Sequence, residues 1–212
     1  MIALSWISIS AIAAIMSLDT TAFGQLMLAR PMVCGPVFGY LLGDVKAGMW
    51  VGMIVELFWA RALPMGAAVP PDTTAITILT LVWGLEAGHE NKRALIVVAF
   101  LFATYAGVLS RQADLLARRL NVQVLYAVDY LIAQGKTWGV TAGVIGGLLV
   151  FFLKAFVFYI LIIPVGNMLV SAVHSLLNDQ ILQAFSHAWK VLPVAGFVVM
   201  LKNFPAKTKR IV

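Results

Sequence analysis

Charged residues are scarce in this sequence: Asp, Glu, Lys and Arg together make up 11% of its 212 residues, whereas 62% are hydrophobic. The mean hydropathy is correspondingly high, at +0.96. A soluble domain usually carries about a quarter charged residues, and this chain has too little polar surface to coat a globule in water. The composition therefore predicts an all-α integral membrane protein, because each helix satisfies its own backbone hydrogen bonds in lipid.

Residues that commonly carry enzyme chemistry are also few. The single cysteine, Cys34, excludes an internal disulfide, and we expect it to serve packing. The sequence contains no phosphate-binding glycine loop and no nucleophile elbow. Its three histidines lack the spacing of metal ligands; they are His89, His174 and His187. We therefore expect no catalytic residue, no metal site and no cofactor in this chain.

Acidic residues are fewer than basic ones, nine against fifteen, which gives a formal net charge of +6. The basic residues lie in short loops and in the tail, a distribution typical of cytoplasmic loops in membrane proteins. This pattern argues against a nucleic-acid partner. Residues 1–18 are apolar but have no Lys or Arg before the apolar run. A cleavable signal normally has that basic start, so this segment is predicted to be a retained membrane helix.

A broken apolar region follows the first helix. Asp19 or Thr20 is expected to cap a new helix, which Arg30-Pro31 would interrupt. From residue 32 to residue 59, one proline, five glycines and a polar Asp-Val-Lys triplet divide the apolar run into two pieces. Each piece is shorter than the about 20 residues of a full helical span. We predict two short segments that turn back within the membrane.

Later segments are longer and more continuous. The arginine-containing segment after residue 110 has apolar residues at helical spacing, which predicts an amphipathic helix at the membrane interface or against a partner. The longest apolar run is expected to end at Pro164, with the amine of Lys154 reaching toward the interface. We interpret residues 1–212 as a single membrane domain, comprising a first membrane helix (1–18), a broken-helix substrate region (19–88), a membrane helix (94–110), an amphipathic helix (111–136), C-terminal membrane helices (137–203) and a basic tail (204–212).

Glu56 is the leading candidate for a functional residue. Gly48, Gly52 and Glu56 are spaced four apart, so on a helix they share one face. In one interpretation, the two glycines leave a groove that leads to a carboxylate, which accepts hydrogen bonds from a hydroxyl-rich ligand. In the other, the glycines allow close helix packing and Glu56 pairs with Arg61. The free-energy cost of a carboxylate at membrane depth favours a functional role.

Asp72 follows a segment that cannot continue a helix, "GAAVPPD". Unpaired backbone groups at membrane depth must be buried in protein or line a watery cavity. Asp72 would then contact a ligand in a re-entrant turn, or only cap the next helix. Gln25 is a further ligand candidate, whereas Arg30 is expected to anchor a helix end at the headgroups. The tetrapeptide "DTTA" occurs at Asp19 and again at Asp72, which is weak support for an internal repeat.

These residues together resemble a known transporter family. The shared features are Arg30-Pro31, Gly35, Gly39, Gly43-Asp44, Gly48, Gly52-x-x-x-Glu56 and Gly66-Ala67-Ala68-Val69-Pro70-Pro71-Asp72. Many fixed positions over some forty residues are more specific than a short motif. The stretch resembles the Enzyme IIC subunit of the mannose/fructose/sorbose family of the bacterial sugar phosphotransferase system (PTS). Beyond Asp72 the similarity is looser.

The resemblance implies a multi-helix transporter subunit with broken helices in the bacterial cytoplasmic membrane. It implies an Enzyme IID partner, larger oligomers, and translocation of a hexose-type sugar by an elevator-like motion. The cytoplasmic IIB and IIA phosphocarrier proteins would supply the phosphoryl group, so the IIC chain would carry no phosphorylated residue. Glu56 and Asp72 would contact sugar hydroxyls, and Gly66 and Ala67 would belong to the turn that shapes the pocket.

Two departures from the family pattern leave a second hypothesis open. Arg61 stands where relatives usually have a small or apolar residue, and the sequence stops where relatives continue with further apolar helices. The chain could instead be a degenerate member that acts as a scaffold or regulatory subunit without transport. A third hypothesis, an intramembrane enzyme using Glu56 and Asp72 as an acid/base pair, is disfavoured because nothing accompanies the two carboxylates as metal ligand or nucleophile.

Overall fold

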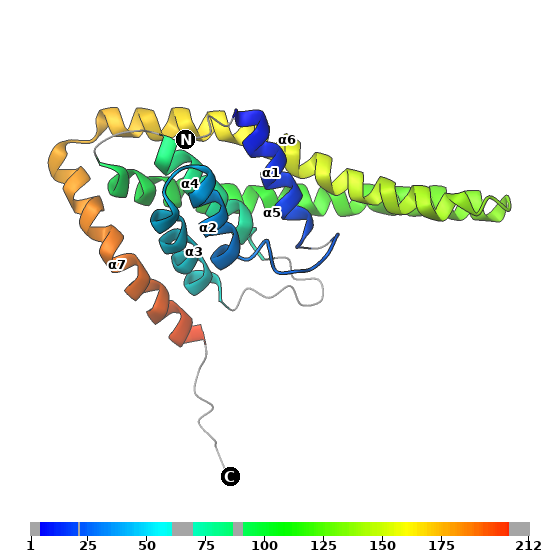
Figure 1. The fold of residues 1–212 in the computed structure, drawn as a ribbon, viewed down its shortest axis with the longest axis horizontal. Helices are drawn as coiled ribbons and strands as arrows, with labels where there is room; N and C mark the ends of the chain where they lie inside the picture. The colour runs from blue at the N-terminus through cyan, green and yellow to red at the C-terminus, as the bar shows by residue number, and fades with distance from the viewer. Residues whose placement is uncertain (1–4, 21, 61–69, 87–90, 204–212) are drawn as a thin grey trace, which may run out of the picture.

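The computed structural model describes residues 5–20, 22–60, 70–86 and 91–203, and within these ranges every regular element is an α-helix. This confirms the predicted all-α class (Figure 1). The helices in chain order are α1 (Trp6–Leu18), α2 (Pro31–Leu41), α3 (Val45–Trp59), α4 (Thr73–Glu86), α5 (Lys92–Ala133), α6 (Trp138–Leu176) and α7 (Asp179–Asn203).

The predicted pair of short segments is present as α2 and α3. Pro31 occupies the first position of α2, where its missing N–H costs nothing. The turn between the helices contains Gly43 at φ +86°, a conformation that favours glycine. Asp44 then caps α3, because its Oδ1 accepts a hydrogen bond from the Ala47 N–H at 3.0 Å. The two helices thus form an antiparallel hairpin.

Close contact between glycines holds this hairpin together. A methyl group added at Gly39 would lie 2.8 Å from the Gly48 Cα, and one added at Gly35 or Gly52 would meet backbone atoms of the opposite helix. The open groove expected along Gly48 and Gly52 is therefore wrong, since backbone of α2 fills it. The alternative interpretation, close helix packing through glycine, is confirmed for these two residues.

Helix α4 lies at the centre of the bundle. Its residues from Thr74 to Gly84 are all buried, so it shows no polar face. It packs against α1, α2, α3, α5 and α6, which surround it. The indole N–H of Trp83 donates to the Ile163 carbonyl at 3.0 Å, and the ring packs on Gly166. This central helix fixes the positions of the elements around the site described below.

Helices α5 and α6 are longer than predicted. One continuous helix, which ends at Ala133, covers the expected membrane helix at 94–110 and most of the expected separate amphipathic helix at 111–136. Pro164 lies inside α6 and does not end it. The C-terminal part of α5 and the N-terminal part of α6, joined by residues 134–137, extend together beyond the bundle as an arm (Figure 1). Leu131 and Val128 of α5 pack there on Gly139 and Gly143 of α6.

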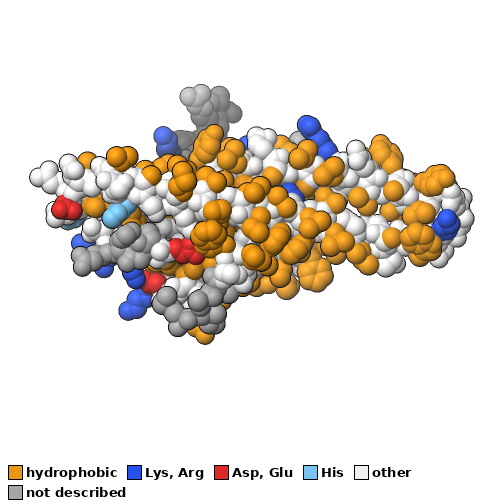
Figure 2. Space-filling model, turned by 90° about the horizontal axis from the view of Figure 1, so that it is seen from above, with side chains coloured by type: hydrophobic (Ala, Val, Ile, Leu, Met, Phe, Trp, Pro, Cys, Tyr) orange, Lys and Arg blue, Asp and Glu red, His pale blue; other side chains and the backbone are white. Residues whose placement is uncertain are grey.

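Three of the described helices are long and apolar enough to cross a membrane: Lys92–Ala133, Trp138–Leu176 and Asp179–Lys202. Figure 2 shows hydrophobic side chains over most of the visible face, including the arm. On the same face, several Lys and Arg side chains gather toward the end opposite the arm. An apolar exterior of this kind suits lipid or partner helices rather than water.

Candidate functional site

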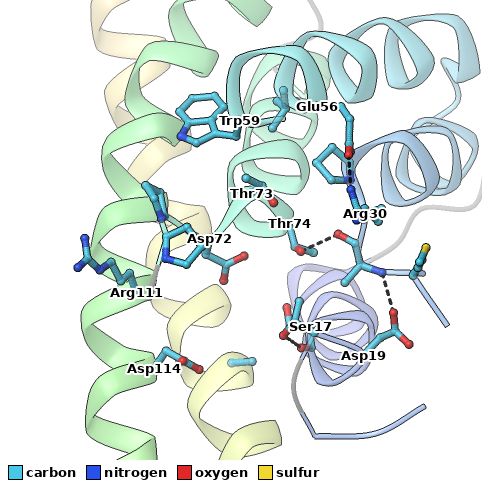
Figure 3. A pocket seen from close by; sticks show the side chains of 18 of the residues that line it. Ser17, Asp19, Arg30, Glu56, Trp59, Asp72, Thr73, Thr74, Arg111 and Asp114 are labelled. Atoms are coloured by element: carbon cyan, nitrogen blue, oxygen red, sulfur yellow. Dashed lines mark hydrogen bonds and ion pairs between the residues drawn. The ribbon is translucent and has the colours of Figure 1, made fainter. Parts of the chain in front are cut away.

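A cavity of about 490 Å³ opens where five parts of the chain meet. It lies between the end of α1, the segment 22–30, the end of α3, residues 70–74 and the middle of the α5–α6 pair (Figure 3). Its volume falls within the roughly 300–1,000 Å³ of small-molecule sites. The polar side chains that line it are Ser17, Asp19, Thr20, Gln25, Arg30, Glu56, Asp72, Thr73, Thr74, Arg111, Asp114, Arg118 and Lys154.

Glu56 lies in the last turn of α3, next to the start of α2. Its Oε1 pairs with Arg30 Nη1 at 2.8 Å, and Figure 3 shows the two side chains facing each other. Its Oε2 is buried and has no hydrogen-bond partner within the described residues. Arg30, which was expected to anchor a helix end at the headgroups, pairs with Glu56 because the turn between α2 and α3 brings the two residues together. The other expected partner, Arg61, lies outside the described residues.

Asp72 ties α4 to α5. Its Oδ1 accepts from the Ala75 N–H at 3.0 Å, which confirms its predicted role as the cap of α4. Its Oδ2 accepts from the Ser110 hydroxyl at 2.7 Å, and its own N–H donates to the Gly107 carbonyl at 3.1 Å. Each carboxylate oxygen thus has a protein partner while Asp72 also lines the cavity.

Asp19 organises the segment between α1 and α2. It ends α1 rather than starting a helix, so the predicted helix after residue 19 is wrong. Its two carboxylate oxygens accept from the Leu26 and Ala29 N–H groups at 2.7 and 3.2 Å. This buried carboxylate thus replaces the backbone partners that a helix would have provided. Gln25, a predicted ligand residue, lies in this segment at φ +50° and lines the cavity.

The two "DTTA" tetrapeptides meet at one residue. Asp19 accepts from the Ala29 N–H, and the Thr74 hydroxyl donates to the Ala29 carbonyl at 2.7 Å. Their local structures differ, because Asp19 ends a helix whereas Asp72 begins one. The two identical tetrapeptides therefore contribute to two walls of one cavity, and they do not have the same local structure.

Sequence reasoning missed the wall formed by α5 and α6. Asp114 accepts from Arg118 Nε at 2.9 Å and from Lys154 Nζ at 3.4 Å. Lys154 was expected to reach the interface, but its side chain is only 15% exposed and pairs with Asp114. Arg111 Nε is buried without a partner within the described residues. The signal that could have found this wall is the four-residue spacing of Asp114 and Arg118, which places the two side chains on one face of α5.

The charges around the cavity balance. Four carboxylates line it together with four cations, a formal sum of zero. Because the acidic and basic side chains are largely paired with each other or with backbone groups, the lining can receive a neutral ligand without an uncompensated buried charge. The unpartnered Glu56 Oε2 can accept a hydrogen bond and the unpartnered Arg111 Nε can donate one. No group of three His, Cys, Asp or Glu side chains within the described ranges could hold a metal ion.

Comparison with known proteins decides the family. Residues 3–211 match the profile of the family described as "PTS system sorbose-specific iic component". The chain belongs to this family. The membership confirms the resemblance seen in the sequence and, with the long apolar helices, makes the chain a multi-pass membrane protein of the mannose/sorbose IIC group.

Curated relatives are similar over parts of their length. The putative N-acetylgalactosamine permease IIC component 2 of Escherichia coli (strain K12) is 31% identical over 99 residues, covering 42% of this chain and 74% of that protein. The mannose-specific EIIC component of the same organism is 28% identical, covering 53% of this chain and 40% of that protein. The fructose permease IIC component of Bacillus subtilis (strain 168) is 24% identical, covering 83% and 64%.

Two solved structures share the fold. One, titled "Structure of membrane protein", has a TM-score of 0.67 at 20% identity. The other, a cryo-EM structure of the mannose transporter ManYZ in complex with microcin E492, has a TM-score of 0.64 at 18% identity. Each match covers 95% of this chain and 78% of the other.

Proposed function

We propose that this chain is the IIC membrane subunit of a PTS permease that translocates a hexose-type sugar across the bacterial cytoplasmic membrane. Family membership supports a sugar-specific IIC role. The observation that carries the proposal is Glu56, which lines a cavity of about 490 Å³ and has a buried oxygen, Oε2, with no hydrogen-bond partner among the described residues. A sugar hydroxyl would supply the missing hydrogen-bond donor, and a neutral sugar suits the balanced charge of the lining.

In this proposal Glu56, Asp72 and Gln25 contact the sugar. Asp72 would do so with lone pairs that its cap and Ser110 leave free, since each carboxylate oxygen can accept more than one hydrogen bond. Gly66 and Ala67 lie outside the described residues, and their place in the sugar site rests on the sequence resemblance. A IID subunit would complete the permease, and IIB and IIA would phosphorylate the sugar from the cytoplasm. An elevator-type movement of the site across the membrane remains part of the proposal.

Uptake in cells tests this function. The chain would be expressed with its candidate IID, IIB and IIA partners in cells that lack other sugar phosphotransferase systems, and radiolabelled hexoses supplied. We expect phosphorylated sugar to accumulate, and Glu56→Gln and Asp72→Asn to abolish accumulation. Glu86→Gln is the matched control, because Glu86 accepts from Asn167 at 2.6 Å outside the cavity. Equal uptake by Glu56→Gln and the wild type would contradict the assigned site.

A second function, a scaffold without transport, is favoured by one observation. Arg30 already pairs with Glu56 at 2.8 Å, so a sugar must share the carboxylate with this cation. If the complex assembles but no hexose accumulates with the wild type, the scaffold function replaces the transport function. Arg30→Gln distinguishes the two, because it would free Glu56 and alter uptake only in a subunit that transports.

A further inference from the structure

A second cavity, of about 790 Å³, lies apart from the sugar site and shares none of its lining residues. Three distant parts of the chain form it: the turn and first residues of α3, the start of α5 and the middle of α7. These segments are more than 40 residues apart in sequence, so only the fold brings them together. The charged and aromatic residues that line it are Asp44, Lys46, Trp50, Lys92, Arg93, Trp189 and Lys190.

This cavity is strongly basic. Four cations and one carboxylate line it, which gives a formal local charge of +3. The carboxylate, Asp44, is already engaged as the cap of α3. The three ion pairs found within the described residues include none of the four cations. All four residues are exposed, so an anion could bind them without displacing a protein partner.

A tryptophan pair forms one wall of the basic cavity. The rings of Trp50 and Trp189 lie 6.0 Å apart at 41°, and the Trp50 indole N–H donates to the Trp189 carbonyl at 3.4 Å. Tryptophan is enriched where lipid headgroups meet the hydrocarbon layer. Beside the two tryptophans, Met49 on α3 and Val191 on α7 are apolar and exposed, with exposed fractions of 59% and 60%. The basic cavity thus borders surface that suits acyl chains.

We propose that this cavity binds the phosphate of an anionic phospholipid, with the acyl chains along the apolar surfaces of α3 and α7. Basic pockets between membrane helices are suited to anionic headgroups, and each nearby Lys or Arg strengthens the attraction. A water-soluble phosphoprotein would match the charge but would leave the adjoining apolar surface of α3 and α7 uncovered. The combination of cations, indole rings and exposed aliphatic side chains therefore favours lipid.

Native mass spectrometry of the full-length chain in detergent tests the site, with phosphatidylglycerol or phosphatidylcholine added as the probe. We expect the chain to retain phosphatidylglycerol in preference to phosphatidylcholine. The variant Lys92→Gln/Lys190→Gln should bind phosphatidylglycerol roughly 25-fold more weakly, about five-fold for each charge. Lys92→Arg/Lys190→Arg keeps both charges and should bind like the wild type. The matched control, Lys136→Gln/Lys202→Gln, removes two charges that do not line the cavity.

Three results would overturn the proposal: equal retention of the two lipids, unchanged binding by Lys92→Gln/Lys190→Gln, or an equal loss in the Lys136/Lys202 control. The last would show a diffuse surface charge effect and no site. Competition by inorganic phosphate at equal concentration would identify a soluble anion site instead of a lipid site. Because sugar uptake is not measured, these outcomes do not depend on the proposed transport function.

Discussion

Glu56 is the residue on which the account of this chain depends. One of its oxygens pairs with Arg30, and the other is buried and has no hydrogen-bond partner in the part of the chain that the structure describes. A buried acceptor without a hydrogen bond costs free energy, about 1–3 kcal/mol or more for a charged group. A ligand that donates a hydrogen bond to this oxygen would offset that cost. The ion pair with Arg30 holds the Glu56 side chain in place, and it also competes with a ligand for the carboxylate.

At the residue scale, Asp19 is predicted to be a positioning residue. Asp19→Asn replaces one of two acceptor oxygens with an NH₂ group, which cannot accept from Leu26 or Ala29. We expect the free energy of unfolding to fall by about 1.5–3 kcal/mol, the range for hydrogen bonds to a charged group. Chemical unfolding of the purified protein in detergent measures this. Asp179→Asn, at an exposed helix start, is the control; an equal loss in both variants would refute the role of Asp19.

The ion pairs between α5 and α6 predict that loss of Asp114 destabilises the protein more than loss of Lys154 does. Asp114→Asn leaves Arg118 and Lys154 without their carboxylate, whereas Lys154→Met leaves Asp114 still paired with Arg118. Because Asp114 and Lys154 are largely buried, we expect Asp114→Asn to destabilise the protein by about 3 kcal/mol and Lys154→Met by clearly less. Thermal unfolding in detergent compares them. An equal or reversed order would contradict this arrangement of partners.

At the element scale, the α2–α3 hairpin carries the site. It sets Arg30 at one helix start and Glu56 in the final turn of the other, and backbone contact between glycines fixes their separation. The turn between the two short helices brings together an acid and a base that are 26 residues apart in sequence. One continuous helix would hold them roughly 39 Å apart. The glycines serve this placement and do not themselves form the cavity.

The hairpin predicts that Gly48→Ala is severely destabilising. The added methyl group would overlap the Gly35 carbonyl and lie 2.8 Å from the Gly39 Cα, both backbone atoms that cannot move aside. We expect a loss of about 3 kcal/mol or more, and little monodisperse protein on size exclusion. Gly147→Ala is the matched control, because its methyl group would meet nothing nearer than 3.8 Å. Normal behaviour of Gly48→Ala would contradict the packing.

Local signals in the sequence predicted the short helices but not the long ones. Pro31, Gly43, Asp44 and Asp72 each mark a helix boundary through their own backbone or side chain. The arginines after residue 110 were interpreted as a change of helix, yet α5 continues because polar side chains there face the cavity and α6. The partner on α6, Lys154, is distant in sequence, so the residues around position 111 do not predict it. Glu56 and Asp72 were predicted as site residues because local patterns, the glycine spacing and the proline pair, mark them. Asp19 and Asp114 were not predicted as site residues, because contacts in the folded chain bring them to the cavity.

At the scale of the whole molecule, two cavities with different electrostatic character occupy separate places. The first has balanced charge and a buried acceptor without a partner among the described residues, whereas the second has a formal charge of +3 beside a tryptophan pair. The arm adds a largely exposed apolar surface (Figure 2). In a chain of the PTS IIC family, the first cavity is the proposed sugar site, and the exposed apolar surface suits lipid or partner subunits.

The cavity beside Glu56 is proposed to bind a sugar. The most direct test is equilibrium binding of radiolabelled hexoses to the chain purified with its candidate IID subunit. We predict saturable binding of at least one hexose that Glu56→Gln weakens by about 10- to 100-fold, the cost of losing a hydrogen bond to a charged acceptor, and that Glu86→Gln leaves unchanged. Equal affinity of the wild type and Glu56→Gln would contradict the assignment of this cavity as the sugar site.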